Sequence, residues 1–148
     1  MLVLRALDGV LFIMPDRVAE RCGVLRPALE DTEGSEGCVP VPGISAATLA
    51  MIVEFYTRVD ESGVLDIPLA AVKARFFDDI PVRPDLFSLM NAANFLDARE
   101  LLDDACVFMA DQLRGKSPEH IRDLLGITTD MTSGDSATIA EQLDWALP

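Results

Sequence analysis

The chain has 148 residues, 50% of them hydrophobic, and its 25 acidic and 12 basic side chains give a formal net charge of -13 at pH 7. This length suits one compact core, the apolar content excludes wholesale disorder, and the negative charge would repel a nucleic-acid backbone. The longest apolar-rich stretch, around residues 46–55, is too short for a membrane span. The three cysteines form no CxxC pair, so a reducing, intracellular compartment is expected rather than a disulfide framework or a zinc ribbon.

The first expected element is a β-hairpin. Two apolar, β-prone runs, residues 2–7 and 10–14, flank the dipeptide Asp8-Gly9. An Asp-Gly pair between such runs is typical of a two-residue turn in which both central residues have positive φ. No basic region followed by a cleavage site opens the chain, so no secretion signal is predicted.

Short helices and an edge strand are expected next. Pro15-Asp16 predicts a helix to about Cys22 that stops at Gly23, and a second short helical segment runs to about Asp31. Residues 38–41 are predicted to form a short strand at a sheet edge or a strand end, because Pro40 and Pro42 lack the N–H that a central strand donates. Ser45 is then expected to cap a helix with apolar residues on helical spacing.

The middle of the chain is its least periodic part. Residues 60–84 contain one glycine and three prolines, and they are predicted to link two halves, although residues 70–77 could hold a turn or two of helix. From Asp85 onward the pattern is helical, and Asp97 is expected to cap a long helix that continues to about Arg114.

Two further helices complete the expected order. Ser117 as N-cap, Pro118 at the first helical position and Gly126 as the stop predict a compact helix. Thr132 followed by Asp135 resembles a capping box that opens a final helix to about residue 145.

Two features leave a core role and a binding role equally open. The long helix after Asp97 has one apolar stripe of Leu101, Ala105 and Phe108, and a second about 100° around the axis. That second stripe, which either packs against a neighbouring helix or faces a partner, consists of Leu102, Cys106, Met109 and Leu113. Trp145 is either an anchor for a partner or a cover for the end of a small core.

No catalytic arrangement is visible. His120, the single histidine, is predicted to be an exposed helix residue without a nucleophile beside it. Residues 115–117, Gly-Lys-Ser, lack the upstream glycine and the strand of a phosphate-binding loop, and the aspartates near residue 104 lie on a helix rather than in a calcium loop. The sequence therefore predicts a protein that is not an enzyme and has no cofactor and no metal.

Four segments of the chain have distinctive motifs: DGVLF at residues 8–12, CVPVPGISAATLAMIVEF at 38–55, NAANFLDARELLDD at 91–104 and GKSPEHIRDLL at 115–125. In this order they resemble the DGxxF hairpin and the PVPLPNVxxxxL, AANYLDIKxLLD and GKTPEEIRKxF motifs of the S-phase kinase-associated (SKP) family, with unchanged spacing between the last two. The members of this family are the F-box-binding adaptors of cullin-based SCF ubiquitin ligases. Asp130, Thr132 and Trp145 also fall at family positions, so the resemblance covers nearly the whole chain.

The resemblance implies an α+β chain with a BTB/POZ fold, in which helices wrap a three-stranded sheet, followed by a helical extension. Residues 1–96 would form the BTB/POZ-like, cullin-facing domain and residues 97–148 the F-box-binding extension, and the two could pack as one continuous unit. The acidic insertion usual in the family before its fourth helix is shortened or absent here.

The resemblance also implies two binding surfaces. The family's cullin-facing Asn-Tyr pair falls on Asn94 and Phe95, where the missing hydroxyl removes a hydrogen bond but keeps the apolar ring. The implied F-box contacts are Leu102, Cys106, Met109, Leu113, Ile121, Leu125, Ile127, Met131, Ile139 and Trp145.

The implied function is that of a non-catalytic SCF adaptor that links F-box substrate receptors to the amino-terminal domain of a cullin, for protein ubiquitination and degradation. The alternative is an F-box-binding relative or mimic that no longer engages cullin and acts as an inhibitor, a chaperone or part of another complex. The partners would include neither nucleic acid nor a membrane, a homodimer is possible when no F-box is bound, and the location would be the cytoplasm and nucleus. A BTB self-assembly module is a third possibility, against which the extra C-terminal helices count.

Overall fold

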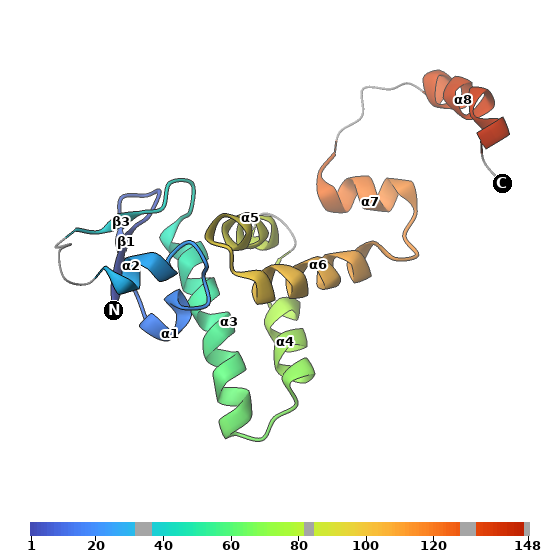
Figure 1. Cartoon of the computed structure of the whole chain (residues 1–148). Helices are drawn as coiled ribbons and strands as arrows, with labels where there is room; N and C mark the ends of the chain where they lie inside the picture. The colour runs from blue at the N-terminus through green and yellow to red at the C-terminus, as the bar shows by residue number, and fades with distance from the viewer. Residues whose placement is uncertain (32–36, 82–84, 128–132, 147–148) are drawn as a thin grey trace. The chain divides into compact units, whose positions relative to one another are not determined.

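The computed structural model describes residues 1–31, 37–81, 85–127 and 133–146. The chain divides into two units, Met1–Gly115 and Lys116–Pro148, and each is described by itself (Figure 1). The first unit contains β1 (Leu2–Arg5), β2 (Leu11–Met14), α1 (Asp16–Ala19), α2 (Arg26–Glu30), β3 (Val39–Pro40), α3 (Ala46–Val64), α4 (Leu69–Asp78), α5 (Phe87–Leu96) and α6 (Arg99–Leu113). The α+β prediction is confirmed, and a small sheet with helices around it is consistent with a BTB/POZ-like fold.

The predicted hairpin is present, but its turn differs from the expected one. The N–H of Gly9 donates to the Ala6 carbonyl at 3.0 Å, so Leu7 and Asp8 are the central residues of the turn. Within this turn, only Gly9 has a positive φ, of 77°. This is a three-residue hairpin loop that ends in a glycine bulge, and it keeps Asp8 out of the left-handed region, which costs energy for a residue with a Cβ.

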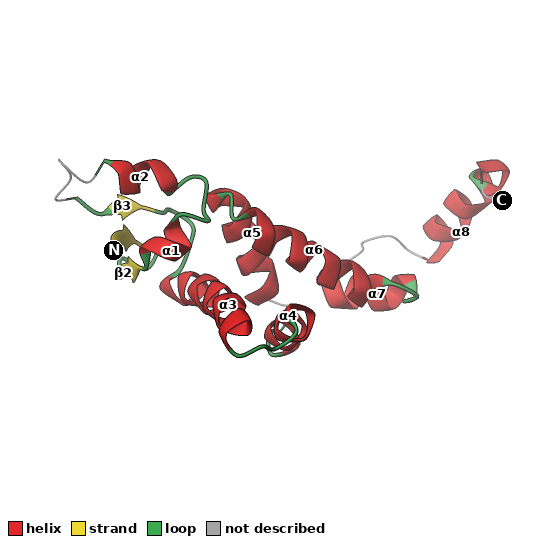
Figure 2. Cartoon of the chain, turned by 60° about the horizontal axis from the view of Figure 1, so that its bottom comes forward, coloured by secondary structure: helices red, strands yellow, loops and turns green. Residues whose placement is uncertain are grey.

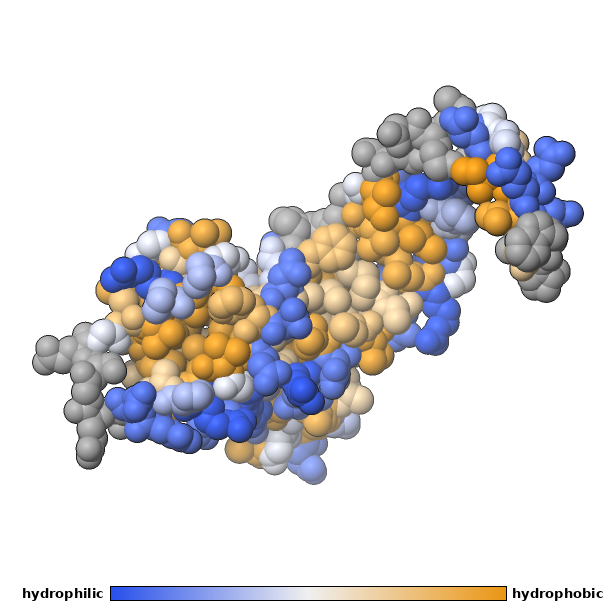
Figure 3. All heavy atoms as spheres, turned by 45° about the horizontal axis from the view of Figure 1, so that its top comes forward, coloured by the Kyte–Doolittle hydropathy of each residue, from blue (hydrophilic) through white to orange (hydrophobic). Residues whose placement is uncertain are grey.

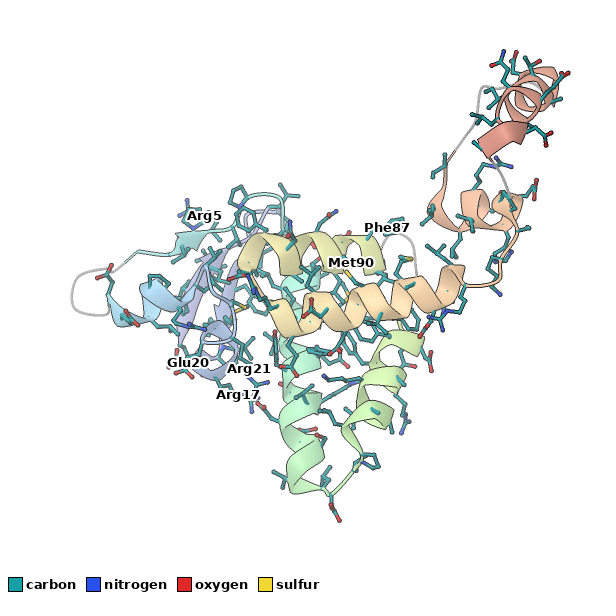
Figure 4. The ribbon with its side chains drawn as sticks, turned by 45° about the vertical axis from the view of Figure 1, so that its right-hand side comes forward. Arg5, Arg17, Glu20, Arg21, Phe87 and Met90 are labelled. Atoms are coloured by element: carbon teal, nitrogen blue, oxygen red, sulfur yellow. The ribbon has the colours of Figure 1, made fainter. Side chains whose placement is uncertain are left out.

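The strands lie in the order β2-β1-β3, with β2 antiparallel and β3 parallel to β1 (Figure 2). The predicted edge position of the 38–41 segment is confirmed, since β3 pairs only with β1 among the described strands. Leu4 and Met14 are fully buried on the inner face of the sheet. Arg17 of α1 and Arg21, two residues after its end, both form ion pairs with Asp60 of α3, which ties this short segment to the long helix (Figure 4).

The interpretation of residues 60–84 as a linker is wrong. Helix α3 begins at the predicted cap, where the Thr48 N–H donates to Ser45 Oγ at 3.2 Å, and it continues to Val64. Helix α4 then packs against α3, with Phe76 and Phe77 only 2% and 3% exposed. The turn or two of helix allowed at residues 70–77 is present as part of α4. Three prolines and a glycine interrupt the sequence pattern around it, and the packed phenylalanines stabilise the helix.

An aromatic cluster holds α3 and α4 together. Phe55 of α3 makes an edge-to-face contact with Phe76 of α4, with ring centroids 5.3 Å apart. Phe77 lies 6.0 Å from Phe55 and stacks on Phe108 of α6 at 5.3 Å. Such pairs add about 0.5–1.5 kcal/mol each beyond the area that they bury, so this cluster joins three helices.

The start of α6 also corrects an expectation. Asp97 does not cap α6 with its side chain; it ends α5 in the left-handed conformation, with φ 55° and ψ 44°, and Ala98 occupies the N-cap of α6. A capping aspartate needs extended backbone, and the tight connection from α5 to α6 forbids it. The core of the first unit is formed by residues from the sheet and from α1, α3, α4, α5 and α6, the largest fully buried being Tyr56, Phe55, Leu4, Met14, Leu25, Leu49, Ile52, Leu86, Leu89, Leu96, Leu101 and Val18.

The second unit contains α7 (Pro118–Leu125), α8 (Ser133–Gln142) and a short 3-10 helix, η2 (Asp144–Ala146). The caps of α7 are confirmed: the His120 N–H donates to Ser117 Oγ at 3.2 Å, and Gly126 has φ 67°. Thr132, half of the predicted capping box, lies outside the described residues. Among the described helices, none is long and apolar enough to cross a membrane.

Candidate protein-binding surfaces

The two predicted cullin-facing residues lie together on the exposed side of α5. The helix buries Leu89, Ala92, Ala93 and Leu96 against the core of the first unit. Asn94 is exposed, and the ring of Phe95 is 46% exposed. An aromatic ring left this open on a rigid helix is suited to a partner contact.

Two α5 residues that the sequence analysis missed extend this surface. Phe87 and Met90 are half-buried and lie on the end of α5 remote from the sheet (Figure 4). They precede Asn94 by seven and four residues, and this spacing brings residues to one side of a helix. Their helical spacing from Asn94 is the sequence signal that could have identified them as part of this surface.

The first apolar stripe of α6 belongs to the core. Leu101 and Ala105 are fully buried, and Phe108 stacks on Phe77 with an interplanar angle of 19°. This stripe therefore faces the interior of the first unit.

The second stripe of α6, proposed from sequence as an F-box surface, is unevenly exposed. Leu102 and Leu113 are half-buried and Cys106 is exposed, whereas Met109 is only 8% exposed. Val107, which the sequence analysis left out, is 62% exposed beside Cys106. The open side of α6 is therefore centred on Cys106 and Val107. The pattern of aliphatic residues along the helix gave no sign that Val107 is exposed.

The remaining predicted F-box contacts lie in the second unit. Ile121 and Leu125 on α7 are half-buried, while Ile127 and Ile139 are 56% and 43% exposed. Leu143, 45% exposed, is an apolar residue of the same unit that the sequence analysis did not include. Met131 lies outside the described residues, and Trp145 belongs to η2 with a side chain that is not among the described ones.

A cationic contact supports α6 from the side of α4. Lys73 Nζ lies 2.7 Å from Asp104 Oδ2 and 3.3 Å from Glu100 Oε1. Burial by itself would lower the pKa of Lys73, but hydrogen bonds and charge attraction from Asp104 and Glu100 outweigh it and raise that pKa above its ordinary value of 10.5. The ammonium therefore stays charged at neutral pH and holds α6 against α4.

The three cysteine thiols differ in burial, and the most buried of them is unreactive. Cys22 is fully buried, and desolvation, followed by the nearby charge of Asp97, raises its pKa to about 11. A thiol in this state is inert at neutral pH. Cys106 is exposed and Cys38 half-buried, and none of the three is in a disulfide.

His120 lies exposed on α7, as predicted. Among the described residues, no group of three or more histidine, cysteine and acidic side chains could hold a metal ion. The arrangement can present apolar helix faces to other proteins, and its polar groups serve capping and ion pairing.

Comparison with known proteins agrees with this picture of helical surfaces. Residues 99–146 match the family described as "Skp1 family, dimerisation domain". SKP1-like protein 20 of Oryza sativa subsp. japonica is 32% identical over 165 residues, covering 99% of this chain and 94% of that protein. The chain belongs to the Skp1 family.

Other Skp1-family relatives align equally fully. SKP1-like protein 4 of Arabidopsis thaliana is 31% identical over 156 residues, with 99% of this chain and 95% of the relative covered. SKP1-like protein 9 of the same plant is 27% identical over 150 residues, with 98% and 95% covered. The family predicted from the four sequence segments is therefore confirmed.

Proposed function

We propose that this Skp1-family chain is a non-catalytic adaptor of an SCF ubiquitin ligase, which links F-box substrate receptors to the amino-terminal domain of a cullin. The proposal rests on family membership along nearly the whole chain. It is supported by apolar helix residues that are exposed at positions where the family's motifs imply partner contacts. The protein acts as a spacer between its partners in the cytoplasm and nucleus, and no step of ubiquitin transfer takes place on it.

The F-box receptor binds the open side of α6 together with apolar residues of the second unit. An amphipathic helical motif is the ligand that such surfaces recognise, through apolar residues at helical spacing. Cys106 and Val107 supply exposed apolar area on α6, and Ile127, Ile139 and Leu143 supply it in the second unit. The functional division of the chain, with cullin binding in residues 1–96 and F-box binding in residues 97–148, is part of this proposal.

Cullin binds the exposed side of α5. Asn94 can donate and accept hydrogen bonds, and the neighbouring ring of Phe95 contributes apolar area at an exposed position. Without the hydroxyl of the family's tyrosine, one hydrogen bond to cullin is lost, which costs about 0.5–1.5 kcal/mol. A weaker but specific cullin contact is the expected consequence.

The test is calorimetric titration of the purified full chain with a recombinant F-box protein and, separately, with a cullin amino-terminal domain. Binding to both partners supports the adaptor. Binding to neither would overturn the proposal and leave only the fold.

The second candidate is an F-box-binding protein that does not engage cullin and serves as an inhibitor, a chaperone or part of another complex. Phe95 is the observation that favours it, because it removes a polar group from the cullin-facing pair. F-box binding without cullin binding in the same titrations would select this candidate. In the absence of an F-box protein, we propose that the chain can form a homodimer.

A further inference from the structure

A hollow of about 340 Å³ lies between α3 and α4, and neither surface proposed above uses it. The two helices form a hairpin that projects from the rest of the first unit (Figure 1). At its tip Asp66 has a positive φ of 53°, and the Ile67 N–H donates to the Ser62 carbonyl at 3.0 Å. Further along, the contact between Phe55 and Phe76 holds the helices together. A defined turn and two packed helices therefore form the walls of the hollow.

Much of the lining is apolar. Four aliphatic residues contribute to it: Leu65, Ile67, Ala71 and Val72. At the lower end of the first unit, toward which the hairpin projects, hydrophobic and hydrophilic side chains both reach the surface (Figure 3). Concave sites with an apolar lining and a few polar groups bind small molecules, and their volumes run from about 300 to 1,000 Å³. A hollow at the lower end of this range suits a small ligand with an apolar part.

One of the two arginines that line the hollow is already paired. Arg58 forms ion pairs with Glu54, one turn earlier on α3, and with Asp79 at 3.7 Å. Its guanidinium also lies over the ring of Phe76, 5.6 Å from the ring centroid. Because these contacts hold Arg58 along the wall and balance its charge, Arg58 has little charge to offer a ligand.

Two other charged residues of the lining are not paired in this way. Glu61 comes from the last turn of α3 and Arg75 from the last turn of α4. Among the residues that the structure describes, neither side chain makes an ion pair. A carboxylate and a guanidinium from two different helices can each bind a ligand group of opposite charge.

A buried hydroxyl group lines the α3 side of the hollow. Ser62 is only 7% exposed, and its Oγ donates to the Val59 carbonyl at 2.6 Å. A hydroxyl that donates one hydrogen bond keeps two lone pairs as acceptors. Ser62 and the preceding Glu61 therefore give α3 two acceptors for a ligand cation.

We propose that this hollow binds a free α-amino acid with an apolar side chain. The carboxylate of the ligand pairs with Arg75, and its ammonium donates hydrogen bonds to Glu61 and to Ser62 Oγ. Its apolar side chain packs on Leu65 and Ile67, which removes exposed aliphatic area from water.

The charges favour a zwitterion over a simple acid or a simple amine. A carboxylic acid would leave Glu61 unmatched, and its anion would approach a chain of net charge -13. An amine would leave Arg75 unmatched. An amino acid has no net charge, so the charge of the chain does not repel it, and its two ionic groups match both residues.

NMR titration of the full chain, labelled with ¹⁵N, with L-leucine tests the proposal. Saturable shifts should appear at the amides of Leu65, Ile67 and Val72, with a dissociation constant on the order of 1 mM, which is modest for so small a ligand. Two analogues test the charges separately, since 4-methylpentanoate lacks the ammonium and 3-methylbutylamine lacks the carboxylate. Each analogue should bind about tenfold more weakly than leucine, because each has lost one charged hydrogen-bonding group.

Two variants test the same charges from the side of the protein. Arg75→Met should weaken leucine binding about tenfold and make the affinities for leucine and 3-methylbutylamine nearly equal. Glu61→Gln should bring leucine and 4-methylpentanoate together in the same way. Both positions are exposed, and circular dichroism checks that each variant folds. The matched control is Arg99→Met, an exposed arginine on α6 outside the hollow, which should leave leucine binding unchanged.

A chain that shows no saturable binding of leucine in the millimolar range overturns the proposal, and so do shifts that map to another part of the chain. Equal affinity of the unchanged protein for leucine and either analogue would overturn the zwitterion. Leucine binding that survives both variants would contradict the roles of Arg75 and Glu61. Neither residue belongs to the proposed F-box or cullin surface, so F-box binding should be the same in Arg75→Met, and failure of this site would leave the adaptor function untouched.

Discussion

Gly23 and Asp97 meet where the loop after α1 passes the junction of α5 and α6. The Gly23 N–H donates to the Asp97 carbonyl at 3.2 Å, and the following N–H, of Val24, donates to Leu96 at 3.1 Å. A Cβ built on Gly23 would overlap the Asp97 carboxylate and approach the Asp97 Cβ to 3.2 Å. Asp97 in turn adopts a left-handed conformation, so this contact fixes the position at which α5 ends.

We expect Gly23→Ala to lower the free energy of unfolding by about 1–3 kcal/mol, the usual cost of overpacking. Asp97→Gly alone should be close to neutral, since glycine accepts the left-handed conformation without strain. Urea denaturation, which measures the free energy of unfolding, should be carried out on the two single variants and on the double variant to test whether a clash with the Asp97 side chain is the cause. The double variant should recover much of the loss, and equal destabilisation with and without Asp97 would contradict a clash between these residues.

Replacing Lys73 by methionine should cost about 1 kcal/mol of stability, the upper end for partly exposed ion pairs. Because the folded-state pKa of Lys73 is raised, its contribution is fully present below pH 10.5 and is lost as the pH rises through the folded-state value. The difference in unfolding free energy between the wild type and Lys73→Met should therefore shrink above about pH 10.5. Arg99→Met, which removes a far more exposed ion pair with Asp97 at the start of α6, is the control and should have a smaller effect at pH 7.

Trp145→Ala should weaken F-box binding by about 2 kcal/mol or more, the threshold for an anchor residue. Calorimetric titration with a recombinant F-box protein measures this change. Val64→Ala, on an exposed part of α3 outside the proposed site, serves as the matched control. An unchanged affinity for Trp145→Ala would remove this residue from the binding site.

Changing Asn94 and Phe95 together to lysine should abolish cullin binding and spare F-box binding, because both side chains are exposed on α5 and neither supports the core. Phe95→Tyr should act in the opposite direction and raise cullin affinity by about 0.5–1.5 kcal/mol, the net value of one hydrogen bond. Loss of both partners in the double variant would mean that the fold had been damaged instead.

Cys106 should react rapidly with a thiol-specific disulfide reagent at pH 8, and Cys22 should react only after unfolding. Exposure differs between the two, and the pKa of Cys22, about 11, leaves it protonated under these conditions. Cys106→Ser should remove the fast phase, while denaturant should release the Cys22 phase. Fast labelling of Cys22 in the native protein would show that the contact between Gly23 and Asp97 opens readily.

The sequence correctly predicted helix ends and turns that are determined by neighbouring residues. Ser45, Ser117 and Gly126 begin or end helices through their own hydrogen bonds or backbone freedom, and Gly9 turns the hairpin. The prediction was wrong where the deciding contact is distant in sequence. Residues 60–84 were predicted to be a linker because their own pattern is aperiodic, whereas the phenylalanines of α4 are held by Phe55 and Phe108, each more than twenty residues away.

The sequence by itself determined the family, the α+β class and most helix ends, because motif spacing, caps and apolar periodicity are properties of neighbouring residues. Only the tertiary structure decided which side of α6 is open, that Asp97 ends one helix rather than capping the next, and that a hollow lies between α3 and α4. Exposure, backbone strain and surface hollows arise when distant segments pack, and the order of residues along a single segment does not specify them.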